Sequence, residues 1–300
     1  MAFRTQKVSD VGTTNPIVAR LGIQTGELLN WSGLDKAQNE AIAELYITKL
    51  TPRLVRCDKR ISTINNKLNK DIARVDKHIQ KDPRVSEIPY VVDLEGDVQD
   101  FLYEAKNYLR DLLGLFRVAY GCKLTDASAF AAMKGKGDSN LVKWAIATFG
   151  ESDHLVRGLR SNNDWMAELI RRRNAYEHPG ENSGTLTIHN VRIDHRGLVP
   201  PRWERTDIPE SDIVDEMTIC VANLLNVAEE LLANLVMRTC RFKVVHICEI
   251  PNDQRDPARP VRLRMSLNEE MQKKRGEAAA KRDTNEVGEI GNVETSQEKG

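Results

Sequence analysis

The segment DWMAELIRRRNAYEHPG, residues 164–180, is where the chain changes from one kind of structure to another. Pro179 disfavours helical backbone at the residue before it, so a helix that enters this segment should end at His178. Beyond it, residues 184–193 alternate in polarity and are rich in β-branched side chains, which predicts a strand. Before it, a stripe with spacings of three and four predicts one face of a helix: Leu155, Leu159, Asn162, Met166, Leu169 and Arg173.

Helical periodicity dominates the rest of the chain. The predicted helices cover residues of about 34–80, 92–119, 140–149, 151–173 and 211–241. Pro52 interrupts the first of these and predicts a boundary or kink near Thr51. The last should be capped by Ser211 or Asp212. Two further strands, at about 198–205 and 243–250, are expected to complete a small three-stranded antiparallel sheet with residues 184–193. The fold class is therefore mainly α, a helical bundle with a small sheet appended.

Composition divides the chain into four segments. Residues 1–33 are expected to form an irregular N-terminal segment, and residues 34–82 a long, basic, amphipathic helix region. Residues 90–250 form the helical domain with its small β element. Residues 251–300 form a charged tail that is expected to be disordered, because it has few large apolar side chains to offset the entropy of ordering.

Charge and cysteine usage exclude several classes of protein. The 44 Lys and Arg residues balance the 44 Asp and Glu residues, so any contact with nucleic acid must come from a local patch. The five cysteines form no C-x-x-C pair, which fits a reducing compartment and offers no zinc site. The beginning of the chain has no secretory-signal pattern. Residues 221–236 are too short and too polar to span a bilayer. We expect a cytoplasmic protein without a membrane span, metal or cofactor.

A basic stretch lies within the first long helix. Residues 53–81 contain nine Lys or Arg residues and three Asp residues, a local charge of +6. This pattern fits either a basic ridge for RNA or tRNA-like substrates, or the solvated face of a long helix. The stretch contains no aromatic residue, so base stacking is not expected there.

Arg173 and His178 form the most informative pair. Arg173 continues an apolar seam, where a charge is costly unless it is paired or functional. His178 should lie five residues later, at the end of the same helix. An arginine can hold phosphate oxygens bidentately and a histidine can move a proton, so the pair suits phosphate chemistry.

The sequence Arg173-Asn174-x-x-x-His178 resembles the R-x(4–6)-H motif of HEPN-domain proteins, and the resemblance covers roughly residues 90–240. Members of that family are commonly metal-independent ribonucleases of toxin–antitoxin or phage-defence systems, with an active site where two protomers meet. The resemblance therefore implies a homodimeric endoribonuclease that cleaves RNA by attack of the 2′-hydroxyl group. It also implies an antitoxin or an activating partner.

The resemblance assigns Arg173 to transition-state charge, His178 to proton transfer and Asn174 to orienting the phosphate. Substrate binding is expected of Arg171, Arg172 and Tyr176. An acid on the second helix is expected to support the site, with no choice made among Glu95, Asp97, Asp100 and Glu104. Two alternatives stay open. One is a non-catalytic HEPN-like module that binds RNA or protein, and the other is a structural dimer formed through the helix at 34–80.

Overall fold

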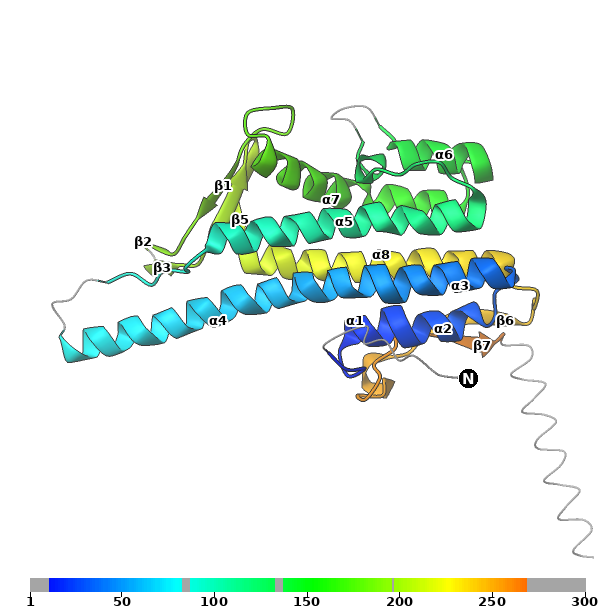
Figure 1. Cartoon of the computed structure of the whole chain (residues 1–300), viewed down its shortest axis with the longest axis horizontal. Helices are drawn as coiled ribbons and strands as arrows, with labels where there is room; N and C mark the ends of the chain where they lie inside the picture. The colour runs from blue at the N-terminus through cyan, green and yellow to red at the C-terminus, as the bar shows by residue number, and fades with distance from the viewer. Residues whose placement is uncertain (1–10, 83–86, 133–136, 196, 269–300) are drawn as a thin grey trace, which may run out of the picture.

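The computed structural model describes residues 11–82, 87–132, 137–195 and 197–268, and these are mainly helical, as the sequence predicts (Figure 1). The helices are α1 (Pro16–Val18), the π-helical turn η1 (Ala19–Ile23), α2 (Gln24–Leu29), α3 (Lys36–Glu44), the π-helical turn η2 (Leu45–Leu50), α4 (Thr51–Lys81), α5 (Leu94–Tyr120), the 3-10 turn η3 (Ala127–Phe130), α6 (Asn140–Phe149), α7 (His154–Glu177), α8 (Ile213–Thr239) and the 3-10 turn η4 (Asn252–Gln254). The strands are β1 (Leu186–His189), β2 (Arg192–Asp194), β3 (Gly197–Val199), β4 (Arg202–Arg205), β5 (Ile208–Asp212), β6 (Val245–Glu249) and β7 (Leu263–Leu267).

One continuous helical rod runs through α3, η2 and α4. It begins at a capping box in which Asp35 and Gln38 satisfy each other's backbone groups. The boundary expected near Thr51 is present, because π-helical η2 gives way to α4 at that residue, but Pro52 does not interrupt the rod. The π-helical turn η2 ends at Leu50, so Pro52 lies in the first turn of α4, where its missing N–H costs least.

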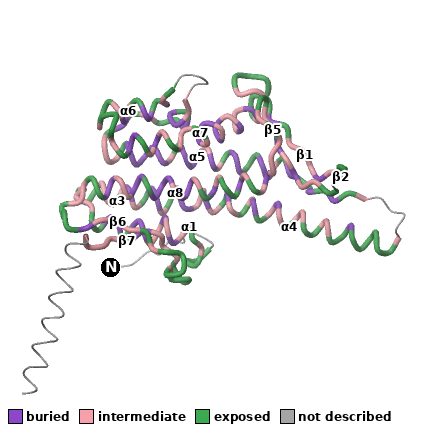
Figure 2. Tube along the Cα trace, turned by 180° about the vertical axis from the view of Figure 1, so that it is seen from behind, coloured by how far each residue is buried: buried purple, intermediate pink, exposed green. Residues whose placement is uncertain are grey.

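The centre of the bundle is formed by α4, α5, α7 and α8, whose inward faces are buried (Figure 2). Tyr46 and Tyr108 are fully buried there. Their hydroxyl groups donate hydrogen bonds to the backbone oxygens of Ala228 (2.8 Å) and Leu224 (3.1 Å) on α8. Each buried hydroxyl therefore has a partner, and the two tyrosines fix the position of α8 within the bundle.

The apolar stripe of α4 is used inside the chain. Leu54, Ile61 and Ile64 are buried, and α4 packs against α5 and α8. This packing leaves the stripe unavailable to a second copy, so the alternative of a structural dimer through this stripe is not supported.

Helix α8 is the most apolar of the long helices. By length and composition alone Ile213–Thr239 could cross a membrane, which differs from the expectation based on the shorter range 221–236. More than half of its most apolar window is buried inside the bundle. This is the pattern of the core helix of a soluble protein.

The N-terminal segment is helical, and the expectation of an irregular segment over 1–33 is wrong for residues 16–29. The Asn15 side chain accepts a hydrogen bond from the N–H of Ile17 (2.8 Å), and Pro16 occupies the first helical position. Leu21 and Leu28 are buried in the core. Tertiary packing therefore stabilises helices too short to be stable alone. Residues 1–10 lie outside the described part.

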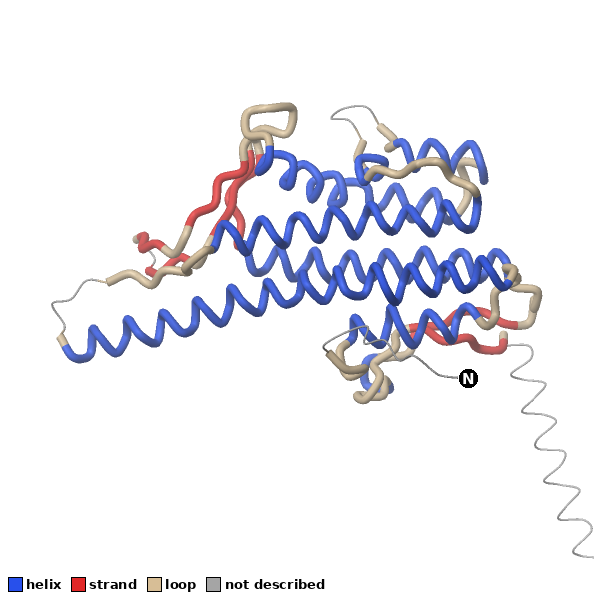
Figure 3. The backbone as a smooth tube through the Cα atoms, viewed as in Figure 1, coloured by secondary structure: helices blue, strands red, loops and turns tan. Residues whose placement is uncertain are grey.

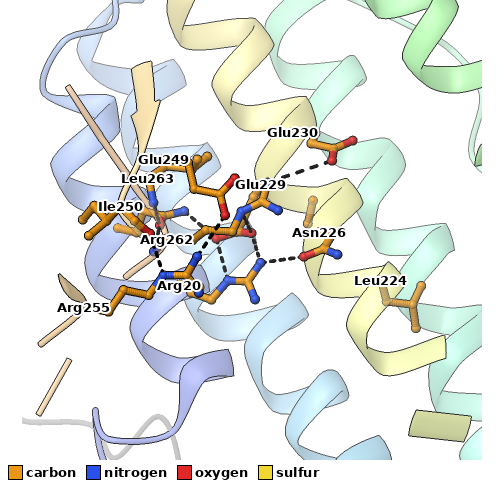
Figure 4. A network of polar contacts seen from close by, with 12 residues as sticks. Arg20, Leu224, Asn226, Glu229, Glu230, Glu249, Ile250, Arg255, Arg262 and Leu263 are labelled. Carbon is orange, nitrogen blue, oxygen red and sulfur yellow. Dashed lines mark hydrogen bonds and ion pairs between the residues drawn. The ribbon is translucent and has the colours of Figure 1, made fainter. Parts of the chain in front are cut away.

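A buried polar network holds this segment in place (Figure 4). Glu229 of α8 is 1% exposed and contacts the guanidinium groups of Arg20 and Arg262. Gln24 donates to Glu229 (2.7 Å) and accepts from the backbone N–H groups of Arg262 and Leu263 (2.7 and 2.6 Å). The network joins the N-terminal helices, α8 and β7.

Two groups of strands lie at opposite ends of the bundle (Figure 3). At one end, β1, β4 and β5 form an antiparallel sheet in the order β1-β4-β5, with the β2–β3 hairpin inserted between β1 and β4. At the other end β6 pairs with β7, and not with the first sheet as the sequence analysis expected. The prediction of a disordered tail from residue 251 is therefore wrong for the part that contains β7. Residues 269–300 lie outside the described part.

Candidate active site at the end of helix α7

Helix α7 ends where the sequence predicts. His178 is the C-cap residue of α7, with φ −130° and ψ 67°. Its backbone N–H donates a hydrogen bond to the backbone oxygen of Asn174 (2.8 Å). The chain then turns through Gly180 at φ 83°, a conformation that favours glycine. The His178 side chain is 56% exposed. Its imidazole is therefore open to a ligand or to a second protein chain.

Arg173 lies one turn earlier and is mostly buried, with 19% of its side chain exposed. Its Nη1 atom contacts the carboxylate of Glu177 and lies 3.5 Å from the Asn174 Oδ1 atom. Its Nε atom is buried and has no hydrogen-bond partner within the described residues. Arg173, on the apolar seam of α7, is therefore paired with Glu177 through Nη1, while its Nε donor is unused within the described part of the chain.

Lys106 of α5 adds a second cation to this place. Its Nζ atom donates to the Asn174 Oδ1 atom at 2.9 Å. Burial, and then the charge of Arg173, lowers the pKa of Lys106. The two cations repel each other, the carboxylates of Asp126 and Glu177 offset part of that repulsion, and a further anion placed between the cations would relieve more of it. Asn174, Arg173 and Lys106 are therefore arranged to receive an anion.

Glu177 connects this cluster to His178. One of its carboxylate oxygens contacts Arg173 and lies 3.8 Å from the His178 Nε2 atom. One chain therefore presents a guanidinium and an imidazole at the end of α7, and an ammonium that α5 adds beside Asn174. These groups can bind a phosphate and move a proton. Glu177 competes with a phosphate for Arg173.

The other residues expected to bind substrate have separate positions. Arg171 donates to the backbone oxygen of Ala132 (2.9 Å), beside η3. Tyr176 is half-buried, and burial, followed by the charges of Glu95 and Asp93, raises the pKa of its hydroxyl group.

Arg172 has turned inward, and substrate binding by this residue does not fit the structure. It is 8% exposed, makes ion pairs with Glu168 and Glu216, and lies over the Trp203 ring, 4.7 Å from the centroid. Three arginines in a row point in different directions because successive residues on a helix are about 100° apart.

Three of the four candidate acids face α4 and do not support this site. Asp97, Asp100 and Glu104 make ion pairs with α4 side chains. Their cationic partners are Arg53, Arg56, Arg60 and Lys67. Glu95 differs, because its charge acts on Tyr176 of α7. Among the four, only Glu95 has a described interaction on the side of α7.

Sequence reasoning missed two members of the cluster. Glu177 could have been found, because an arginine and a glutamate four residues apart on a helix are neighbours. Lys106 carries no such signal, since its place beside Asn174 depends on how α5 crosses α7.

No family model, curated protein or solved structure matches this chain. The resemblance to the HEPN family therefore stays a prediction carried by the motif. Within the described residues, no cluster of three or more His, Cys, Asp or Glu side chains is arranged to hold a metal ion.

Proposed function

We propose that the protein is a metal-independent endoribonuclease that acts as a homodimer, similar to HEPN toxins or abortive-infection effectors. The observation that carries this proposal is that two cations, Arg173 and Lys106, lie beside the Asn174 side chain, next to the exposed imidazole of His178. Holding two like charges close together costs free energy, and binding of an anionic substrate would reduce that cost. A phosphodiester next to a histidine is a substrate for proton-transfer chemistry.

The reaction follows from the charges. The 2′-oxygen of RNA attacks the adjacent phosphorus atom as a base removes its proton, and the 5′-oxygen leaves as an acid protonates it. The products are a 2′,3′-cyclic phosphate and a 5′-hydroxyl end. Arg173 stabilises the added negative charge at phosphorus, and Asn174 orients the phosphate. A second protomer related by a two-fold axis supplies a second histidine, so that one acts as base and the other as acid.

Glu177 favours the alternative of a non-catalytic module that binds RNA or protein. Its carboxylate already occupies the Arg173 guanidinium, and a phosphate must displace it. In the catalytic interpretation, substrate or dimer formation moves Glu177 away. In the binding interpretation, it stays.

Two further features fit the proposal. All five cysteines are unpaired, as expected for a protein of the reducing cytoplasm. The candidate site lies open on the surface at His178, which leaves room for a second protomer or for an inhibitory antitoxin.

The test is cleavage of total RNA in the presence of EDTA. We expect wild-type protein to cleave it. His178→Ala should reduce the rate by at least about 100-fold through the loss of an acid–base group, and Arg173→Ala by at least about 100-fold through the loss of charge stabilisation. Matched controls lie on the same helix: Arg157→Ala and His154→Ala remove exposed side chains near its beginning. Both should cleave at the wild-type rate.

The outcomes separate the two interpretations. Cyclic phosphate ends made by wild type and by both control variants support the ribonuclease. Cleavage by His178→Ala at the wild-type rate rules out the proposed role of that residue. If no form of the protein cleaves but all of them bind RNA, the non-catalytic module is correct.

A further inference from the structure

The last turns of α4 form one wall of an open groove of about 640 Å³. This basic groove is lined by Lys67, Lys70, Arg74, Lys77, Lys81 and Tyr90. Its other wall is the segment that leads into α5, residues 87–92. The groove lies where α4 extends beyond the rest of the bundle (Figure 1).

Specific contacts hold the second wall against α4. The Asp71 carboxylate accepts from the backbone N–H of Tyr90 at 2.7 Å, and Lys67 donates to the Val92 oxygen at 2.9 Å. On its far side, Val91 exchanges two hydrogen bonds with the Asn190 side chain, at 2.9 and 2.8 Å. Residues 90–92 of this wall are therefore held by contacts on both sides, to α4 and to Asn190.

The charge of the groove is strongly positive. Its lining holds five Lys or Arg side chains and one Asp, an excess of four positive charges. Arg74 is engaged by Asp71 and Glu87. Lys70, Lys77 and Lys81 make no ion pair or side-chain hydrogen bond with any other described residue. These three ammonium groups are free to bind an anion, and they are spread over about 16 Å of helix axis.

An aromatic ring completes the groove. Tyr90 is 60% exposed, and its neighbour Val92 is 67% exposed. The hydrogen bond from its backbone to Asp71 fixes Tyr90 beside the lysines without using its ring or hydroxyl group. An exposed ring on a backbone held beside a row of lysines can stack on a base while the lysines contact its phosphates.

We infer that the basic groove binds single-stranded RNA, outside the Arg173–His178 site. A single strand offers unpaired bases to the Tyr90 ring, whereas the bases of a duplex are stacked on each other. An anionic membrane is a poorer fit, because Asp71 and Glu87 lie among the cations and the surface is concave. The choice of RNA over other polyanions rests on the proposed function.

The location suits a substrate anchor. The C-terminal end of α4, the N-terminal end of α5 and the C-terminal end of α7 all lie toward the same end of the molecule (Figure 1).

The experiment measures binding of a fluorescently labelled single-stranded oligouridylate by fluorescence anisotropy, with the full chain carrying His178→Ala so that the probe stays intact. In that background, the triple variant Lys70→Ser/Lys77→Ser/Lys81→Ser is compared with Lys49→Ser/Lys59→Ser/Lys123→Ser. The control variant removes three exposed lysines elsewhere and has the same net charge.

We expect the groove variant to bind at least about tenfold more weakly than the control variant. The slope of log K against log salt concentration should fall by about 2, since each lost phosphate contact on a single strand contributes about 0.7. Tyr90→Ala should weaken binding roughly 5- to 100-fold, as expected for one stacked base. Tyr90→Phe keeps the ring and should bind as the parent protein does.

Three results would overturn the inference: equal binding by the two triple variants, equal binding of a duplex of the same length, or binding to phosphatidylserine vesicles without binding to RNA. Failure of the proposed function is a separate result. A wild-type protein that cleaves no RNA, but whose binding depends on Tyr90 and the three lysines, keeps the groove and loses the ribonuclease.

Discussion

The two halves of α4 are both rich in Lys and Arg but have different surroundings. In the proximal half, Arg53, Arg56, Arg60 and Lys67 make ion pairs with Asp97, Asp100, Glu104 and Asp111 of α5. In the distal half, Lys70, Lys77 and Lys81 line an open groove without such partners. The difference arises because α5 begins at Leu94 and covers only the proximal half. Cations on α4 therefore stabilise the fold where the acidic side chains of α5 face them. Where α5 does not face them, they form a candidate binding surface.

If pairing with α5 stabilises the proximal half, the loss of Asp97 should have the largest effect on folding. Asp97 is 3% exposed and contacts both Arg60 (3.3 Å) and Lys67 (2.5 Å). We expect Asp97→Ala to lower the free energy of unfolding by about 3 kcal/mol, because it leaves two cations without their buried partner. Urea denaturation measures this change.

The control for that measurement is Asp100→Ala. Asp100 also contacts Arg60, at 2.6 Å, but it is 55% exposed. Its loss should cost less than about 1 kcal/mol. Equal costs for the two substitutions would mean that burial does not decide the strength of these pairs.

A smaller effect should depend on pH. Burial alone would raise the pKa of Glu104, but hydrogen bonds from Arg56 and Arg53 outweigh it and lower that pKa. The folded state therefore favours the ionised carboxylate. The stabilisation that the ionised Glu104 provides is complete above the pKa of the unfolded chain, about 4.3. It is lost as the pH falls through the lower pKa of the folded state. We expect Glu104→Gln to cost about 1–2 kcal/mol at neutral pH.

Denaturation at several pH values tests the sign. The difference in stability between wild type and Glu104→Gln should shrink as the pH falls below about 4. A difference that stays constant down to acid pH would show that the amide disturbs packing, and that the charge of Glu104 contributes nothing.

The distal half should show the smallest effect on stability. Lys70→Ser and Lys77→Ser each remove a side chain without a described partner, so the free energy of unfolding should change by no more than about 0.5 kcal/mol. Thermal or urea denaturation is sufficient for this comparison. A loss above 1 kcal/mol in either variant would place the distal lysines with the structural cations of the proximal half.

The sequence predicted those features that depend on neighbours along the chain. The spacing of apolar residues predicted the long helices, and Pro179 predicted that α7 ends at His178. Asp212 caps α8 through its side chain, as the pattern at 211–212 indicates. These signals are local, so one segment is enough to find them.

Features that depend on distant partners were missed. Residues 16–29 have too few helical turns to show a clear period, and their helices exist because α8 and β7 pack on them. The pairing of β6 with β7 is set by where the chain returns after η4. The basic stretch contains no aromatic residue, yet Tyr90 reaches it from beyond the end of α4.

The candidate site divides in the same way. Arg173, Asn174 and His178 lie on neighbouring turns, so the motif finds them. Lys106 comes from another helix. The resemblance placed a supporting acid on the second helix without choosing among four candidates, but the side of α5 that carries residues 97, 100 and 104 faces α4.

The contact between Arg20 and Glu229 has a consequence for the order in which the protein is made. The two residues are 209 positions apart in the chain. At a synthesis rate of about 5–20 residues per second, Arg20 is made roughly 10–40 s before its partner. During that interval the apolar side chains of Leu21 and Leu28 have no α8 to cover them. The contacts that Arg20 and Gln24 make with α8 and β7 can therefore form only after the chain has been made as far as β7.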